Sequence, residues 1–158
     1  MKWGSTVNAR EFEIRPLLLT DKVRWLELWE GYLAFYSHPL TSEQNDLTWS
    51  RIHDPHFNLY GLVATIDGAV VGFTHYLFTP SSWAMNQYCY LEDLYVDPTV
   101  RGVGAGRSLI DAVIAAARAK FSEQVYWTTR EGNNRARVLY DSYTSASDFV
   151  QYRLPQSY

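Results

Sequence analysis

Cysteine is nearly absent from this sequence. Cys89 is the only one, so no disulfide can form within the chain, and one thiolate cannot build a structural zinc site. It lies in an apolar, strand-like run, which indicates a small core residue rather than a nucleophile and a reducing, intracellular setting. The histidines show no metal-ligand spacing, so we expect no bound metal and interpret each as satisfied or exposed. They are His38, His53, His56 and His75.

Long apolar runs and an excess of basic residues are missing too. No segment approaches the roughly 20 residues that span a bilayer, and residues 1–10 lack the apolar segment of a signal peptide. Lys and Arg number 14 against 17 Asp and Glu, a net charge of -3, whereas a nucleic-acid surface needs a clustered basic face. We therefore expect a cytoplasmic protein with no membrane or nucleic-acid partner, and a cationic or small neutral partner is easier to accommodate.

Aromatic residues are abundant. They make up 16% of the 158 residues, with 6 Trp and 12 Tyr, and hydrophobic residues make up 47%. This composition is typical of a globular protein with a strongly aromatic interior or cleft. A chain of this length buries about two-thirds of its unfolded surface in one core. We predict a single domain over residues 1–158, of which residues 1–10 form a flexible extension.

The first third of the chain changes from strand to helix periodicity. The alternation in FEIRPL, Phe12 to Leu17, predicts a half-buried first strand. From Thr20 to Tyr36 an amphipathic helix is predicted, because apolar residues recur at three- and four-residue spacing: Trp25, Leu28, Trp29, Tyr32, Leu33 and Tyr36. TSEQ, Thr41 to Gln44, has the form of a capping box and predicts a second helix to about Ile52.

The remainder is predicted to contain five strands and two helices. Asp67-Gly68 joins two β-rich runs into a hairpin, and QYCYLEDLYV forms a third strand that leads through a glycine-rich turn into a helix over Gly104 to Lys120. QVYWTT is the next strand, NNRARVLYDSY a helix capped by Asn133, and DFVQYRL the last strand. The order β-α-α-β-β-β-α-β-α-β predicts an α/β fold with a mixed sheet covered by helices on both faces.

The glycine-rich turn predicts an anion site. Gly102, Gly104 and Gly106 remove three side chains where strand meets helix, so backbone N–H groups can approach a ligand closely. The positive end of the helix dipole, with Arg101 and Arg107, favours a phosphate or pyrophosphate. The loop does not match the dinucleotide fingerprint G-x-G-x-x-G, whether the motif starts at Gly102 or at Gly104. It also lacks the Lys of a Walker loop.

Both the loop and its flanks resemble the GNAT superfamily of acetyl-CoA-dependent N-acetyltransferases. The family's pyrophosphate loop, Q/R-x-x-G-x-G/A after an L-x-V-x-P strand, matches RGVGAG after LYVDP. The chain resembles the polyamine (spermidine/spermine) acetyltransferases in four segments: YLEDLYV, RGVGAG, NN and LY. It resembles the yeast histone/polyamine and D-amino-acid acetyltransferase group in two others, WLELWEGYLAFY and FVQYRL. The resemblance covers nearly the whole chain and implies a mostly antiparallel mixed sheet of six to seven strands with about four helices.

Acetyl-CoA is the co-substrate that this resemblance implies. In the family the strand before the loop splays from its neighbour, and its backbone binds the pantetheine and the thioester oxygen, here at Leu94, Tyr95 and Val96. The loop holds the pyrophosphate. The implied loop residues are Arg101, Gly102, Val103, Gly104, Ala105, Gly106 and Arg107, and the residues beside the pantetheine are Asn133, Asn134, Ala136 and Tyr140.

Glu92 is the predicted general base. An alkyl ammonium has a pKa of about 10, so it must lose a proton before it attacks a thioester. Some polyamine enzymes of the family carry a catalytic glutamate at the matching position, and burial among tyrosines is expected to raise its pKa. Deprotonation relayed by water is the alternative. Asp93 points to the opposite face by strand alternation, and we interpret it as structural.

Tyr140 is the predicted general acid. Its place in NNRARVLY matches the tyrosine with which many GNAT enzymes protonate the coenzyme thiolate. It lies seven residues, or two helical turns, after Asn133, so both share one helix face. The alternative is a core tyrosine on an amphipathic helix. After this helix the chain departs from the family pattern, because a longer polar segment over 141–149 replaces a short Gly-Phe turn.

The acceptor is predicted to be a primary amine of a polyamine, a lysine-like amino acid or a basic peptide. Aromatic faces beside carboxylates suit such a cation, and the predicted acceptor-binding residues are Glu92, Trp29, Tyr32, Tyr36 and Trp83. A non-catalytic acetyl-CoA sensor, or an acyltransferase with another acyl donor or acceptor, stays open as an alternative. The resemblance also implies a homodimer to which FVQYRL contributes.

Overall fold

The computed structural model describes residues 12–100 and 102–157. The predicted extension over residues 1–10 and the predicted loop residue Arg101 lie outside this described part. The chain divides into two compact units, one ending at Trp127 and the other running from Thr128 to Tyr158. The first unit contains the sheet and three of the α-helices, and the second contains the last helix.

A five-stranded sheet forms the centre of the first unit, and its strands lie side by side in chain order. The first four strands are antiparallel, and the fifth joins the fourth in parallel after a helical crossover. The strands are β1 (Phe12–Pro16), β2 (Tyr60–Ile66), β3 (Ala69–Thr79), β4 (Gln87–Val96) and β5 (Ser122–Tyr126).

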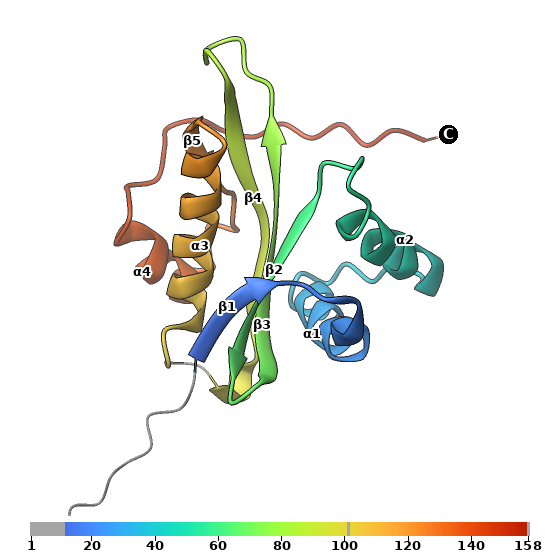
Figure 1. The fold of residues 1–158 in the computed structure, drawn as a ribbon. Coiled ribbons are helices and arrows are strands. Elements are labelled where there is room, and N and C mark those ends of the chain that lie inside the picture. The colour runs from blue at the N-terminus through green and yellow to red at the C-terminus, as the bar shows by residue number, and fades with distance from the viewer. Residues whose placement is uncertain (1–11, 101, 158) are drawn as a thin grey trace, which may run out of the picture. The chain divides into compact units, whose positions relative to one another are not determined.

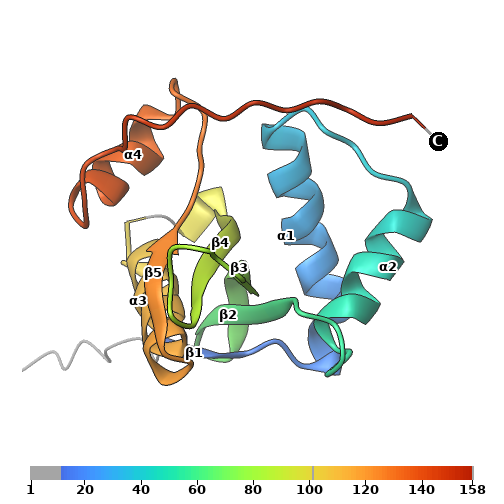
Figure 2. The ribbon, with the colours of Figure 1, turned by 90° about the horizontal axis from the view of Figure 1, so that it is seen from above.

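Helices cover both faces of this sheet, as predicted. Helix α3 lies against one face, and α1 and α2 lie against the other (Figures 1 and 2). The α-helices are α1 (Lys22–Phe35), α2 (Ser42–Ile52), α3 (Ala105–Ala119) and α4 (Asn134–Asp141), and two short 3-10 turns are η1 (Leu19–Asp21) and η2 (Pro98–Val100).

The aromatic stripe of α1 belongs to the hydrophobic core. Side chains three and four residues apart on α1 meet the inward face of β2 and β3 and one tryptophan of α2, which buries them together. This cluster consists of Leu17, Trp25, Leu28, Trp29, Leu33, Trp49, Val63, Val70 and Phe73. A second cluster lies under α3 and consists of Ala64, Ile66, Val71, Ala105 and Leu109.

Two local signals of the sequence are confirmed. Thr41 Oγ1 accepts from the Gln44 backbone N–H at 3.2 Å, and Gln44 Oε1 accepts from the Thr41 N–H at 3.0 Å, which completes the capping box of α2. Asp67 and Gly68 join β2 to β3 with φ values of +50° and +80°, the left-handed conformation that a tight hairpin turn needs.

The predicted last strand is wrong. Residues 144–157 hold no helix or strand, so the sheet has five strands rather than six to seven. The alternation in DFVQYRL marks an extended segment, but a strand also needs a partner backbone. Helix α4 is the only regular element in the described part of the second unit, so that unit offers no strand to pair with. Phe149, Tyr152 and Leu154 are accordingly exposed.

Candidate active site

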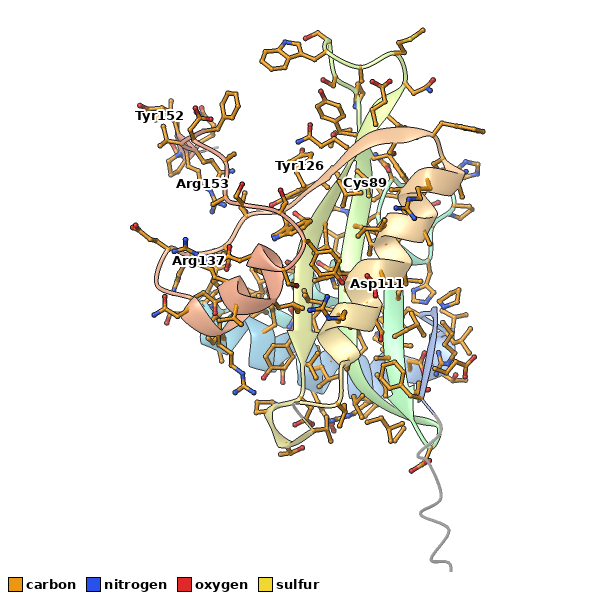
Figure 3. All side chains as sticks on the ribbon, turned by 90° about the vertical axis from the view of Figure 1, so that its left-hand side faces the viewer. Cys89, Asp111, Tyr126, Arg137, Tyr152 and Arg153 are labelled. Carbon is orange, nitrogen blue, oxygen red and sulfur yellow. The ribbon has the colours of Figure 1, made fainter. Side chains whose placement is uncertain are left out.

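Strand β4 parts from β5 halfway along its length. The parallel ladder joins Gln87–Tyr90 of β4 to β5, whereas β4 continues to Val96. Tyr126, labelled in Figure 3, is the last residue of β5 and lies where the two strands part. Its ring stacks on that of Tyr90, with the ring centroids 4.9 Å apart. Leu94, Tyr95 and Val96 come after this point, so β5 does not pair with their backbone. Such an edge can bind an extended ligand by backbone hydrogen bonds.

Glu92 is the extra residue of a β-bulge. Tyr76 of β3 lies opposite Leu91, and His75 lies opposite Asp93, so Glu92 has no partner residue on β3. A bulge bends its strand and re-aims side chains, and bulges are common beside active sites. The bulge interrupts the simple alternation from which we inferred the direction of Asp93.

The pKa of the Glu92 carboxyl is raised. Glu92 is exposed rather than buried among tyrosines as predicted, but desolvation by the surrounding protein raises its pKa, and the charge of Asp93 raises it further. A protonated His75 would act on it in the opposite direction. A carboxyl with a raised pKa at a bulge, beside an open strand edge, is suited to general base chemistry.

Asp93 and His75 form a buried pair that the sequence did not reveal as part of a site. His75 Nδ1 lies 2.9 Å from Asp93 Oδ2, and the Trp25 indole N–H donates to His75 Nε2 at 3.0 Å. His75 is therefore a satisfied histidine, as predicted. Two adjacent carboxylates inside an otherwise apolar strand were the only sequence signal for this cluster.

Asp97 connects the end of β4 to its neighbours. Its backbone N–H donates to the Val71 carbonyl at 2.8 Å, and its carboxylate accepts from the Thr99 N–H and hydroxyl at 2.9 and 2.7 Å. The Arg24 guanidinium of α1 also binds this carboxylate. These donors lower the pKa of Asp97. The start of the glycine-rich loop is thereby held against both β3 and α1.

The glycine-rich loop has the backbone that an anion site needs. Gly102 and Gly104 have φ values of +86° and +85°, in the left-handed region that favours glycine. A Cβ at either position would meet no atom within 4 Å, so the space in front of the loop is open. Helix α3 begins at Ala105, and its first N–H groups have no acceptor within the helix. Gly106 and Arg107 lie in this first turn, and Val103 is exposed.

The predicted acceptor-binding aromatics occupy three different environments. Trp29 is 6% exposed, and its indole N–H donates to Asn45 Oδ1 at 2.9 Å, so it is a core residue. Tyr32 is half-buried on the next turn of α1 and Tyr36 is half-buried just after the end of that helix, with ring centroids 5.0 Å apart. Trp83 is 79% exposed in the loop before β4.

Tyr140 and Asn133 belong to the second unit. Asn133 occupies the N-cap position of α4, as predicted, but its side chain makes no capping hydrogen bond, and its side-chain N–H instead donates to Thr129 Oγ1 at 2.9 Å. Asn134 and Ala136 lie in the first turn of α4, and Tyr140 lies in the last. The spacing of Asn133 and Tyr140 by two helical turns therefore holds.

Three further expectations concern the cysteine, metals and membranes. Burial raises the pKa of Cys89 to about 11, and Cys89 is 0% exposed, which confirms it as a core residue. In residues 12–100 and 102–157, no three His, Cys, Asp or Glu side chains gather closely enough to hold a metal ion. None of the helices in these ranges is long and apolar enough to cross a membrane.

Comparison with known proteins decides the family. The sequence profile of the acetyltransferase (GNAT) family matches residues 25–143. The chain belongs to the GNAT acetyltransferase family. It is 36% identical over 149 residues to the D-amino-acid N-acetyltransferase of Saccharomyces cerevisiae, covering 93% of this chain and 92% of that protein. It is 31% identical over 84 residues to the thialysine N-epsilon-acetyltransferase of Caenorhabditis elegans, covering 53% and 52%.

The GNAT fold is also seen in solved structures. An aminoglycoside N-acetyltransferase in complex with CoA superposes with a TM-score of 0.78 at 19% identity, covering 94% of this chain and 98% of that chain. The family profile and the two relatives confirm the resemblance to a GNAT acetyltransferase and show that this protein is an acyltransferase. The site residues themselves stay predictions.

Proposed function

We propose that this GNAT protein transfers an acetyl group from acetyl-CoA to a primary amine of a small cationic acceptor, by direct attack in a ternary complex. The observation that carries the proposal is Glu92, a carboxyl with a raised pKa at the bulge of β4, close to where β5 departs. Relatives named for D-amino acids and for thialysine, whose names specify N-acetylation, support an amine acceptor.

The chain has a backbone surface that fits acetyl-CoA. The β4 edge at Leu94, Tyr95 and Val96 suits an extended pantetheine, and the N–H groups from Gly102 to Arg107 suit a pyrophosphate at the positive end of α3. Asn133, Asn134 and Ala136 contact the pantetheine in this proposal. The bound thioester supplies the acetyl group.

Glu92 and Tyr140 handle the protons. Glu92 accepts a proton from the acceptor's ammonium, which frees the nitrogen lone pair for attack on the thioester carbon. The negative charge of Glu92 and Asp93 also attracts the cation before the proton leaves. The Tyr140 hydroxyl gives a proton to the departing thiolate. The nitrogen loses two protons between ammonium and amide: Glu92 takes the first and releases it to water, and the second, lost from nitrogen after the attack, replaces the proton that Tyr140 gives to sulfur.

Tyr32 and Tyr36 form the aromatic wall of the acceptor site. Both are half-buried, so each offers part of a ring face to a cation. Trp29 supports Tyr32 from the core, since their rings stack with centroids 5.3 Å apart. Trp83 precedes β4, whose first residue is already about 17 Å along the strand from Glu92, so it does not line this wall in the same subunit.

The deciding experiment measures CoA release from acetyl-CoA with spermidine, spermine, short diamines, L- and D-lysine, other amino acids and histone-tail peptides. Turnover with one amine class identifies the acceptor. Tight acetyl-CoA binding without turnover on any amine would instead support a sensor. Turnover with other acyl-CoAs or with alcohols would support a different acyltransferase.

We also expect a homodimer. Phe149, Tyr152 and Leu154 are exposed along an extended segment, and apolar side chains in such a segment favour burial against a partner. Sedimentation equilibrium gives the mass directly. A monomer at micromolar concentration would contradict this expectation.

A further inference from the structure

A buried chain of hydrogen bonds connects α1 to β4 next to Glu92. The Trp25 indole N–H donates to His75 Nε2 at 3.0 Å, and His75 Nδ1 lies 2.9 Å from Asp93 Oδ2. The charge of the same carboxylate acts on the Tyr32 hydroxyl of α1. Asp93 is therefore coupled to groups on two different elements, β3 and α1.

The chemistry of indole determines which nitrogen of His75 carries the proton. An indole N–H can only donate, so His75 Nε2 must present its lone pair to Trp25. The proton of the neutral ring is then on Nδ1 and points at Asp93. A second proton on Nε2 would face the Trp25 N–H, so this contact disfavours the imidazolium. The network carries one negative charge, on Asp93.

Burial makes this network rigid. Trp25 is 0% exposed and His75 is 1% exposed, and the Asp93 side chain is 12% exposed. The ring of His75 lies among Trp29 and Phe73, at centroid distances of 5.3 and 4.8 Å. Neither ring nitrogen can change partners without disturbing this packing.

The Tyr32 hydroxyl keeps its proton. Burial, and next the charge of Asp93, raise the pKa of Tyr32 far above its usual value. Tyr36 and Tyr90 act on Tyr32 in the same direction. Tyr32 therefore takes no part in proton transfer.

Among the described residues, Asp93 of β4 and, when it is protonated, His75 of β3 act on the Glu92 carboxyl. On α1, Tyr32 is acted on by Asp93, and Tyr36 just after the end of that helix acts on Tyr32. Helix α3 carries Arg107, Asp111 and Arg118, but it covers the sheet face opposite α1 (Figures 1 and 2). On β5, Glu123 accepts from the backbone N–H groups of Met85 and Asn86 in the loop before β4, and Tyr126 stacks on Tyr90.

We propose that the Trp25–His75–Asp93 network is a positioning device that holds a fixed carboxylate charge beside Glu92 and so sets how readily Glu92 takes a proton from the acceptor amine. This inference rests on the proposed function. His75 and Trp25 act only through Asp93, and a neutral His75 is essential because an imidazolium would cancel the charge of Asp93. Desolvation, and next the charge of Asp93, raise the pKa of Glu92, which is the direction that this role requires.

The first test determines the tautomer of His75 in the unaltered protein. Long-range proton–nitrogen NMR distinguishes the two neutral forms of an imidazole. The Nδ1–H tautomer is expected. A dominant Nε2–H tautomer, or an imidazolium near neutral pH, would overturn the inference without any substitution.

The second test follows the Glu92 carboxyl by carbon NMR during a pH titration. In Asp93→Asn the midpoint of Glu92 moves to lower pH, because a neighbouring negative charge is lost. In Trp25→Phe the midpoint also moves to lower pH, because His75 is free to take a second proton. Trp49→Phe is the matched control, since its ring packs on Trp25 at 4.9 Å while both nitrogens of His75 have other partners.

The outcomes separate this inference from the proposed function. With an active acceptor, the acidic limb of kcat/KM should move to lower pH in Asp93→Asn and in Trp25→Phe, and stay in place in Trp49→Phe. Turnover with an unmoved Glu92 midpoint in Asp93→Asn overturns the positioning role alone. A protein that acetylates no amine overturns the proposed function, whereas the NMR titration still measures whether Asp93 acts on Glu92.

Discussion

Gly31 of α1 lies against the phenol of Tyr95 of β4: a Cβ at Gly31 would be 2.7 Å from the Tyr95 hydroxyl oxygen and 3.1 Å from the adjacent ring carbon. Real Cβ atoms do not approach so closely, so a side chain at residue 31 would force the Tyr95 phenol to shift. This contact joins the helix that carries Tyr32 to the strand that carries Glu92.

Gly31→Ala should therefore destabilise the protein, although alanine normally stabilises a helix interior relative to glycine. We expect the free energy of unfolding to fall by about 1–3 kcal/mol, measured by urea denaturation. Tyr95→Phe in the same chain removes the clashing oxygen and should restore part of the loss. Gly132→Ala is the control, because a Cβ there meets nothing within 4 Å. Equal stability of Gly31→Ala and the parent protein would contradict the close packing.

Asp21 should make stability depend on acid. Arg15 donates to both of its carboxylate oxygens at 2.7 and 3.0 Å, and the Leu18 N–H donates at 2.8 Å. The Arg15 hydrogen bonds lower the pKa of Asp21 despite its burial. A lowered pKa means that the carboxylate stabilises the fold fully above about pH 4, and that this contribution is lost as pH falls through the folded-state pKa.

Asp21→Asn should thus lower the free energy of unfolding by about 1.5–3 kcal/mol near neutral pH. The difference from the parent protein should shrink in acid. Asp46→Asn is the matched control, since Asp46 pairs with Lys22 at 2.8 Å on the surface and should change stability by about 0–1 kcal/mol. A pH-independent difference for Asp21→Asn would argue against the ionised pair as its cause.

Glu92→Gln should lower kcat/KM by about 10²–10⁴ and remove the acidic limb of its pH profile. The pKa of Glu92 is raised, and only the carboxylate that exists above this pKa can accept a proton. Activity should therefore rise as the pH increases through the pKa of Glu92. Steady-state rates over a range of pH test this. A profile that keeps its acidic limb would eliminate Glu92 as the base and favour deprotonation through water.

Tyr140→Phe should bind acetyl-CoA as the parent does and lose turnover by about 10²–10⁴. Phenylalanine keeps the ring on α4 and removes only the proton that the thiolate needs. Calorimetry gives the affinity, and CoA release gives the rate. Tyr143→Phe, three residues along the chain, is the control and should retain activity. Full activity in Tyr140→Phe would refute its role as the acid.

Gly104→Ala should weaken both the fold and acetyl-CoA binding. Its φ of +85° costs an L-residue about 1–2 kcal/mol, and relief of this strain would re-aim the loop's N–H groups. Gly68→Ala is the matched control, because it has the same sign of φ, +80°, and equally open space, but lies in the β2–β3 turn. Both should lose stability, and only Gly104→Ala should lose affinity for acetyl-CoA. Equal affinities would show that the loop does not bind the coenzyme.

Short-range signals predicted most of the fold. The capping box at Thr41 and Gln44 and the Asp67-Gly68 turn depend on atoms within a few residues, so their conformations follow from local hydrogen bonds and steric limits. The last strand failed because pairing is a long-range property: DFVQYRL has the alternation of a strand, but alternation does not supply a partner.

The sequence by itself determined the family, the glycine-rich loop and the position of Glu92 in an apolar strand, because motif spacing and periodicity are local. Only the tertiary structure decided that Trp29 is a core residue, that β4 bulges at Glu92, and that Trp25, His75 and Asp93 meet. These residues are 18 to 68 positions apart in the chain. Their contacts arise when α1 packs on the sheet, and a bulge changes strand register in a way that residue identity does not encode.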